Sequence, residues 1–309
     1  MTDPWPDVYL TGPGRSGTTS LYQYLTQHPE IYAGPTKEHR YFDETVPAVE
    51  DDPQALAEAR EDYLDRFRGA EGHELVVDGT PSYVYYRDAL ERIHERRPDA
   101  RFITSYRDPV ERTYSLYWLM VASGKEEMDF LDAIEEGLAD DRAGRYHTDR
   151  VKFIRNSRQG TQLQRLYEIF GEDQVLVLLF TDVVEDTSQV LVDVAEFLDI
   201  DPEVAGELDT ETQHNATPGV PPNELAHMIR SSDTLKTIAQ TLLPESVRDF
   251  LGNQVLLEER EKPPMDPQAR RKLADVFEPE VRQVEKLLDR ELPELRASWP
   301  EDVGRRAEP

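Results

Sequence analysis

The sequence predicts an α/β fold in which helices cover both faces of a central parallel sheet. Short apolar runs typical of strands alternate with segments whose apolar residues recur at helical spacing. A glycine-bearing loop joins the first apolar run to the first helical segment. Beyond residue 199 the strand-like runs stop, so the C-terminal part should be helical. We expect one domain over residues 1–309, with its core at 7–200 and a helical extension at 201–309.

The first strand is predicted at residues 8–11, and the helix after the glycine loop should end at His28-Pro29. Each later strand is also followed by a helical pattern. The other strands are predicted at 31–32, 74–78, 101–106 and 174–180. The other helices are predicted at 53–67, 87–96, from Pro109, within 124–144, at 160–170 and at 187–198. The unbroken apolar run at 174–180 suits a central strand buried on both faces.

The charge is strongly negative, at −28, from 63 acidic and 35 basic residues. Only 7 of the basic residues are lysines, and this acid-rich, lysine-poor composition resembles that of proteins from halophilic microbes. Such a charge repels nucleic acid and anionic membranes, so an anionic ligand must be bound by local cations. The chain has no cysteine, which excludes disulfides and cysteine catalysis.

No apolar segment approaches the length of a membrane span, and the first residues lack the pattern of a signal peptide. These two features lead us to expect a cytoplasmic protein without a transmembrane segment. They leave open a peripheral contact with a membrane.

The glycine loop, residues 12–19, reads Gly-Pro-Gly-Arg-Ser-Gly-Thr-Thr. Gly12 and Gly17 have the spacing of a P-loop, which makes the predicted fold P-loop-like. The backbone N–H groups of such a loop and the positive end of the following helix point at one anion. Thr18 stands where a nucleotide triphosphatase has lysine, so the sequence does not favour an enzyme that hydrolyses ATP or GTP. The residues expected to bind the anion are Gly14, Arg15, Ser16, Gly17, Thr18 and Thr19.

A second motif follows the strand predicted at 101–106. Arg107 leaves that strand immediately before Asp108-Pro109, and its planar guanidinium suits a phosphate. If this strand pairs with the first one, Arg107 lies beside the glycine loop. Ser115 lies two helical turns further on and can bond the same phosphate if the helix packs inward.

A third motif is Lys37-Glu38-His39-Arg40-Tyr41-Phe42, in a loop rich in titratable groups. A fourth is Thr80-Pro81-Ser82-Tyr83, directly after the strand predicted at 74–78. Taken together, the four motifs resemble those of the sulfotransferases that use 3′-phosphoadenosine-5′-phosphosulfate (PAPS). The third and fourth are similar to those of the branch that modifies glycans such as heparan sulfate. The resemblance runs from about residue 7 to residue 200.

The resemblance implies that PAPS is the co-substrate, with its 5′-phosphosulfate in the glycine loop and its 3′-phosphate at Arg107 and Ser115. Glu38 would be the general base that takes the proton of an acceptor hydroxyl. Arg15, helped by Lys37, would stabilise the charge on the leaving phosphate, so no metal is required.

Some positions depart from the family pattern. His39 is the rival base, because some branches of the family use histidine, although a histidine in such a loop most simply lies on the surface. Arg15 replaces a common lysine, Tyr41 replaces a phenylalanine, and Gly79 stands where glycan-modifying relatives often carry a lysine. The late loop that closes over the nucleotide has no clear match, and residues 214–217 are a weak candidate for it.

We therefore expect an enzyme that transfers a sulfuryl group from PAPS to a hydroxyl of a carbohydrate, either a glycan or a glycolipid. The alternatives are a kinase of the P-loop type and a non-catalytic nucleotide-binding module. A kinase lacks support because no clear aspartate for Mg²⁺ exists beyond Asp78. Specificity for the acceptor would lie in residues 43–72 and 124–158, where the resemblance is weakest.

Overall fold

The computed structural model describes residues 5–34, 36–146, 148–210 and 262–303. The chain divides into two compact units. The first unit comprises Met1–Pro109, Arg158–His214 and Phe277–Ser298, and the second comprises Val110–Ser157, Asn215–Val276 and Trp299–Pro309. The expectation of a single domain over 1–309 stays a prediction. The candidate late loop at 214–217 lies outside the described residues.

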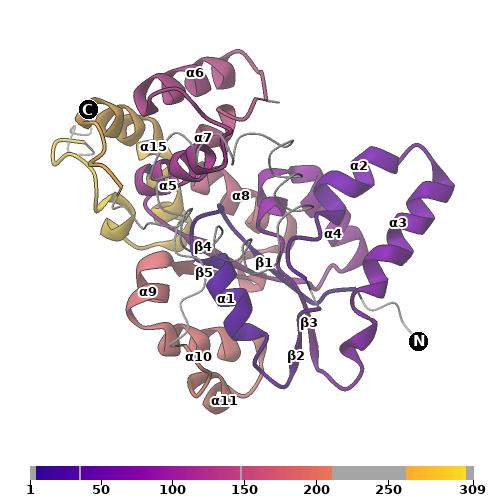
Figure 1. The fold of residues 1–309 in the computed structure, drawn as a ribbon. Coiled ribbons are helices and arrows are strands. Elements are labelled where there is room, and N and C mark those ends of the chain that lie inside the picture. The colour runs from indigo at the N-terminus through magenta and orange to yellow at the C-terminus, as the bar shows by residue number, and fades with distance from the viewer. Residues whose placement is uncertain (1–4, 35, 147, 211–261, 304–309) are drawn as a thin grey trace, which may run out of the picture. The chain divides into compact units, whose positions relative to one another are not determined.

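A five-stranded parallel sheet forms the centre of the first unit (Figure 1). Its strands lie in the order β2 (Ile31–Tyr32), β3 (Leu75–Asp78), β1 (Val8–Thr11), β4 (Arg101–Tyr106) and β5 (Val175–Leu179). All four neighbouring pairs are parallel. The carboxyl ends of β1, β3 and β4 therefore meet at one edge of the sheet, and the predicted fold class is confirmed.

Helices cover both faces of this sheet (Figure 1). On one face, Val8, Leu10 and Ile103 pack in a buried cluster with helices α1 (Thr18–Leu25) and α10 (Thr187–Leu198). On the other face, Tyr9 stacks on Phe102 with 5.3 Å between ring centroids. That face is covered by α4 (Arg87–Arg96) and α8 (Gln159–Phe170). The alternation of side chains along β1 thus builds the two cores of a three-layer fold.

The prediction for residues 174–180 is only partly right. The segment forms β5, but among the strands that the structure describes β5 lies at the edge of the sheet and pairs with β4 alone. Leu176 and Val177 are half-buried rather than buried. The apolar run is explained by the helices α8 and α10, which contact β5, and not by strands on both sides.

Three of the remaining described helices match predicted segments, at 53–65, 109–122 and 130–142, and two lie in the C-terminal part expected to be helical, at 202–206 and 267–288. Three short helices were not predicted, at 46–49, 151–155 and 180–185. In the first unit the remaining helices are α2 (Val46–Val49), α3 (Pro53–Asp65), α9 (Phe180–Glu185) and α11 (Pro202–Gly206). The second unit contains nearly all of α5 (Pro109–Ala122), together with α6 (Phe130–Arg142) and α7 (Val151–Arg155). A long helix, α15 (Pro267–Leu288), contributes residues to both units. No helix in the described ranges is long and apolar enough to cross a membrane.

Local signals explain where several helices begin. Asp52 accepts hydrogen bonds from the backbone N–H groups of Gln54 and Ala55 and thereby caps α3, which starts at Pro53. Asp186 caps α10 in the same way, through the N–H of Gln189. Helix α1 differs, because Gly17 precedes it and provides no side-chain cap. The residue before α1 therefore offers no side-chain acceptor to the N–H groups of its first turn.

Candidate active site

The glycine loop leaves the centre of the sheet at the end of β1 and leads into α1. Gly12 and Gly17 both have positive φ, at 124° and 83°, a conformation that favours glycine. A Cβ at Gly12 would lie 3.0 Å from the carbonyl oxygen of Ser105, so only glycine allows β4 to approach this closely. Ser105 Oγ then donates to the carbonyl of Ser16 (2.6 Å). The loop is fixed against β4 by its own backbone.

The interior of the glycine loop suits an anion. The hydroxyl of Ser16 is buried and has no hydrogen-bond partner within the described ranges. A buried hydroxyl without a partner is costly, and a phosphate oxygen would satisfy it. The first turn of α1, to which Gly17 offers no side-chain acceptor, follows directly in the chain. These features of the loop fit a phosphate group.

Lys37 reaches the glycine loop from the third motif. Its Nζ donates to Thr19 Oγ1 (2.9 Å) and to Thr18 Oγ1 (3.3 Å). Burial lowers the pKa of Lys37 to about 8, although the neighbouring carboxylate of Glu38 opposes the change. A cation with a lowered pKa therefore lies at the two hydroxyls where a P-loop would place its own lysine and serine.

We expect binding of a nucleotide phosphate to be coupled to proton uptake by Lys37. At pH 8 a substantial fraction of the lysine is neutral, and a nearby phosphate would raise its pKa and protonate it. Calorimetric titration with adenosine 3′,5′-bisphosphate at pH 8, in two buffers of different ionisation enthalpy, measures this uptake. Lys37→Met should abolish it. Equal uptake in the variant would mean that another group takes the proton.

The same lowered pKa affects stability. The folded protein holds the Lys37 proton less tightly than the unfolded chain, in which the pKa of lysine is about 10.4. The resulting destabilisation is complete below about pH 8 and is lost as the pH rises towards the unfolded value. The free energy of unfolding of the ligand-free protein should therefore rise relative to Lys37→Met between these pH values, as measured by denaturant unfolding.

Arg107 follows β4 and lies beside the glycine loop, as the pairing of β1 with β4 requires. Its Nη1 donates to the carbonyl of Arg15 (3.2 Å). Its guanidinium lies over the ring of Phe180, 4.6 Å from the centroid. Gln159 Nε2 donates to the Arg107 carbonyl (2.6 Å), which fixes the backbone. The first unit thus brings together the glycine loop, Lys37 and Arg107.

Ser115 lies on α5 in the second unit and is buried. Lys262 Nζ donates to its hydroxyl at 3.5 Å. Sequence analysis missed this cation. Its signal is a lysine immediately before Pro263-Pro264, well after residues 214–217, the candidate for the late loop. Because Ser115 and Arg107 belong to different units, their joint binding of one phosphate stays a prediction.

The loop around Glu38 has an unusual backbone. Glu38 and Arg40 have positive φ, at 61° and 53°, which is uncommon for residues other than glycine. The N–H of Glu38 donates to the carbonyl of Gly79 (3.2 Å), and the Glu38 side chain is exposed. The loop therefore holds this carboxylate out toward solvent while its backbone is tied to the end of β3.

His39 does not lie on the surface as expected. Its ring packs edge-on against Phe67 and Tyr63, with centroids at 5.0 and 5.8 Å. Both ring nitrogens are buried, and neither has a hydrogen-bond partner among residues 5–34, 36–146, 148–210 and 262–303. Burial lowers the pKa of His39, opposed by the negative charge of Asp78. The positive φ values on either side of His39 turn it inward, which a sequence pattern does not reveal.

Asp78, at the end of β3, connects the third and fourth motifs. It is fully buried and accepts hydrogen bonds from Thr80 Oγ1 (2.6 Å), Tyr63 OH (2.7 Å) and Tyr83 OH (3.1 Å). Burial raises the pKa of its carboxyl, and these hydrogen bonds oppose the rise. Tyr83 OH also accepts from the N–H of Tyr41 (3.2 Å). Asp78 is therefore a structural centre that joins the two motifs.

The fourth motif and Tyr85, two residues after it, also contact the glycine loop. The N–H of Gly12 donates to the Pro81 carbonyl (3.3 Å), and the N–H of Gly14 donates to Tyr85 OH (2.8 Å). A steric constraint explains why position 79 is glycine and not the lysine of glycan-modifying relatives. A Cβ there would lie 2.4 Å from the ring of Tyr22 and 3.1 Å from Lys37 Cγ. A lysine at this position would displace Tyr22 and the stem of Lys37.

No cluster of three or more His, Asp or Glu side chains arranged as metal ligands occurs within the described ranges. The sheet, its flanking helices and the strand–loop–helix unit at its centre define a P-loop-like α/β protein. The model of the sulfotransferase family matches residues 37–203, more than half of the chain. The chain belongs to the sulfotransferase family.

Similar proteins agree with this assignment. Human carbohydrate sulfotransferase 15 is 28% identical over 171 residues, which cover 43% of this chain and 30% of the relative. Human heparan sulfate glucosamine 3-O-sulfotransferase 6 is 30% identical over 113 residues, 37% of this chain and 30% of the relative. The rat carbohydrate sulfotransferase 15 is 23% identical over 297 residues, 80% of this chain and 51% of the relative. The matched part thus spans between about a third and a half of these curated relatives.

The fold is similar to that of a solved structure, a sulfotransferase from Alicyclobacillus acidocaldarius. The TM-score is 0.68 at 22% sequence identity, over 94% of this chain and 99% of the other. At this identity the likeness concerns the fold. It supports the P-loop-like architecture described above.

Proposed function

We propose that the protein transfers a sulfuryl group from PAPS to a hydroxyl of a carbohydrate. The observation that carries the proposal is the convergence of the glycine loop, Lys37 and Arg107 at one edge of the sheet, in a chain of the sulfotransferase family. A carbohydrate acceptor is proposed because relatives are named for carbohydrates and for heparan sulfate glucosamine.

In the proposed reaction, the acceptor oxygen bonds to sulfur while the bond from sulfur to the bridging oxygen of PAPS breaks. Glu38 takes the proton of the acceptor hydroxyl. The exposed side chain of Glu38 supports this role better than the buried ring of His39 does. Charge that develops on the leaving phosphate is stabilised by Arg15 and by the protonated form of Lys37. Gly14, Ser16, Gly17, Thr18 and Thr19 hold the 5′ end of the donor, and Arg107, with Ser115, holds its 3′-phosphate.

The kinase alternative is weakened by Asp78. A P-loop kinase needs a carboxylate that binds Mg²⁺, and Asp78 was the candidate. Both oxygens of this fully buried carboxylate already accept hydrogen bonds from hydroxyl groups. Lys37 also differs from a P-loop lysine, because it comes from a separate loop. We therefore prefer sulfuryl transfer to phosphoryl transfer.

Adenosine 3′,5′-bisphosphate should raise the melting temperature of the protein. A ligand that binds the folded state stabilises it by about 2.7 kcal/mol at a concentration of 100 times Kd. ATP with Mg²⁺ should raise it much less, since the site has no group assigned to a γ-phosphate. A thermal-shift measurement with both nucleotides tests this. A larger shift with ATP and Mg²⁺ would favour the kinase instead.

A further inference from the structure

Tyr146 is an exposed aromatic residue in the second unit. The exposed fraction of this residue is 49%, and the only similarly exposed aromatic residue in the described part of the chain is Tyr86, at 44%. Single exposed aromatic residues are common and need no explanation. Tyr146 differs because Arg155, at the end of α7, lies over its ring with the guanidinium carbon 3.9 Å from the centroid. The guanidinium covers one face of the ring, so the exposed part of Tyr146 comprises the other face and the ring edge.

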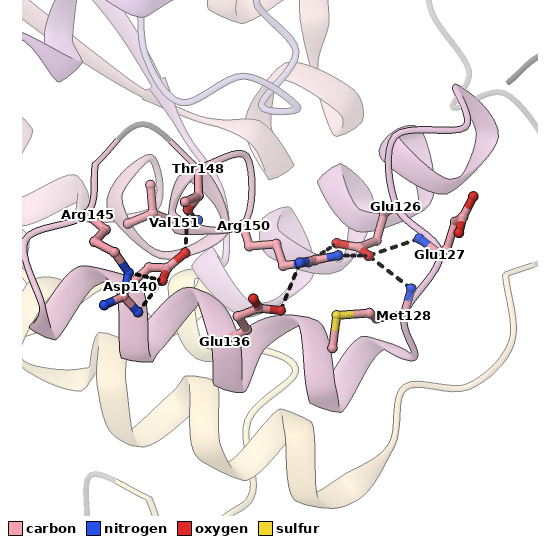
Figure 2. A network of polar contacts seen from close by, with 9 residues as sticks. All are labelled: Glu126, Glu127, Met128, Glu136, Asp140, Arg145, Thr148, Arg150 and Val151. Carbon is pink, nitrogen blue, oxygen red and sulfur yellow. Dashed lines mark hydrogen bonds and ion pairs between the residues drawn. The ribbon is translucent and has the colours of Figure 1, made fainter. Parts of the chain in front are cut away.

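The loop that carries Tyr146 is held on both sides by one carboxylate. Asp140 on α6 accepts hydrogen bonds from Arg145 Nε (2.8 Å) and from Thr148 Oγ1 (2.6 Å), as Figure 2 shows. The N–H of Arg145 also donates to the Asp140 carbonyl (2.9 Å). These hydrogen bonds hold the pKa of the Asp140 carboxyl below its usual range, with Thr148 as the larger cause. The loop is therefore fixed one residue before Tyr146 and two residues after it.

A second ion-pair network fixes the end of the same loop (Figure 2). Arg150 binds Glu126 through Nε (2.8 Å) and Nη2 (3.0 Å), and binds Glu136 through Nη1 (2.8 Å). Glu126 also accepts from the N–H groups of Glu127 and Met128. A Cβ at Gly137 would lie 2.5 Å from the Arg150 carbonyl, so α6 packs closely against the loop. A surface fixed in this way loses little entropy when it binds a ligand.

The charge of this segment opposes that of the chain. Residues 142–155 contain five basic residues and one acidic residue, whereas the whole chain carries −28. Three of these basic residues form ion pairs with carboxylates: Arg145 with Asp140, Arg150 with Glu126, and Lys152 with Asp149. Arg155 stacks on the tyrosine instead. These ion pairs balance most of the positive charge of residues 142–155, so this segment lacks the acid excess of the chain as a whole.

We propose that Tyr146, held in place by Arg155, binds a sugar ring of the acceptor. The apolar C–H face of a pyranose packs on the face of the Tyr146 ring that Arg155 leaves uncovered, while the guanidinium supports the ring from the other face. Tyrosine suits such a contact, because it offers a large rigid surface at low cost in conformational entropy. The inference rests on the proposed transfer to a carbohydrate, and it assigns Tyr146 to the acceptor.

Nuclear magnetic resonance of the full chain with ¹³C-labelled tyrosine rings tests the proposal. The probes are the methyl glycosides of glucose, galactose, N-acetylglucosamine and glucuronic acid, at up to tens of millimolar, since a single ring contact is weak. At least one glycoside should shift the Tyr146 signals saturably and leave those of Tyr86 unchanged. No selective shift of Tyr146 with any of the four would overturn the proposal, as would equal shifts of both tyrosines.

Variants distinguish the loss of the Tyr146 ring from a general effect on the fold. Saturation transfer from protein to glycoside should show about tenfold weaker binding for Tyr146→Ala, the scale of one lost aromatic contact. Tyr146→Phe keeps the ring and should bind within a few-fold of the wild type. Tyr86→Ala is the matched control and should bind normally. A loss as large in Tyr86→Ala, or none in Tyr146→Ala, contradicts the assignment.

The nucleotide measurement keeps the two proposals distinct. A thermal shift with adenosine 3′,5′-bisphosphate but no glycoside binding would overturn the sugar platform and leave sulfuryl transfer standing. Glycoside binding without a nucleotide-induced thermal shift would support the sugar-binding role of Tyr146 and overturn sulfuryl transfer. The protein would then bind carbohydrate without being a transferase.

Discussion

Replacing Glu38 by Gln should lower turnover by about 10²–10⁴-fold, the range for loss of a general base. Glutamine keeps the size of the side chain but cannot take a proton from the acceptor. The Glu38 backbone is held by the carbonyl of Gly79, a contact that the substitution leaves in place. Affinity for adenosine 3′,5′-bisphosphate should therefore stay within a few-fold. The measurements are an assay of sulfate transfer to a carbohydrate acceptor and a calorimetric titration with the nucleotide.

His39→Phe is the matched control for this prediction. The ring of His39 packs among aromatic side chains, so phenylalanine fills the same space without the two nitrogens. If Glu38 is the base, His39→Phe should keep most of the turnover. The opposite pattern, with an active Glu38→Gln and an inactive His39→Phe, would transfer the role to the histidine. Loss of nucleotide binding in Glu38→Gln would mean that the residue maintains the loop.

Arg107→Ala should weaken binding of nucleotides that carry a 3′-phosphate by about 10- to 150-fold, or 1.5–3 kcal/mol, the scale of a hydrogen bond to a charged group. Adenosine 5′-phosphosulfate lacks this phosphate and should be affected much less. Calorimetric titration of the variant with both nucleotides measures the difference.

Arg101→Ala is the control, because Arg101 lies at the opposite end of β4 and pairs with Asp199. It should change neither affinity. Arg107 also donates to the Arg15 carbonyl in the glycine loop. Equal losses for the two nucleotides in Arg107→Ala would therefore show that Arg107 acts only by holding the loop, and would remove its assignment to the 3′-phosphate.

Local sequence patterns predicted the elements well. Helices α4 and α10 and strand β4 have the predicted bounds, because each has a clear apolar period and a clear stop. The predicted central position of β5 was wrong. An apolar run indicates that a strand is buried, but not whether helices or neighbouring strands bury it. The adjacency of β1 and β4, on which the placement of Arg107 depended, is confirmed.

The candidate site was predicted less completely, because side-chain direction depends on backbone angles that sequence alone does not give. The inward turn of His39 follows from the positive φ of Glu38 and Arg40, neither of which is a glycine. The hydrogen bonds of Lys37 to Thr18 and Thr19 join segments about twenty residues apart and have no local signal. The glycine spacing, in contrast, was readable because Gly12 and Gly17 are each required by their own φ.

The central position of β1 has a consequence for the making of the protein. Residues 8–11 are synthesised well before both of their partners, β3 and β4, the second of which begins at Arg101. At 5–20 residues per second, β1 waits roughly five to eighteen seconds for its second neighbour. During that time one edge of β1 lacks its partner strand, and Ser105, which anchors the glycine loop, has not yet been added to the chain. The glycine loop can therefore reach its final form only after β4 has been synthesised, although its own residues precede β4 in the chain.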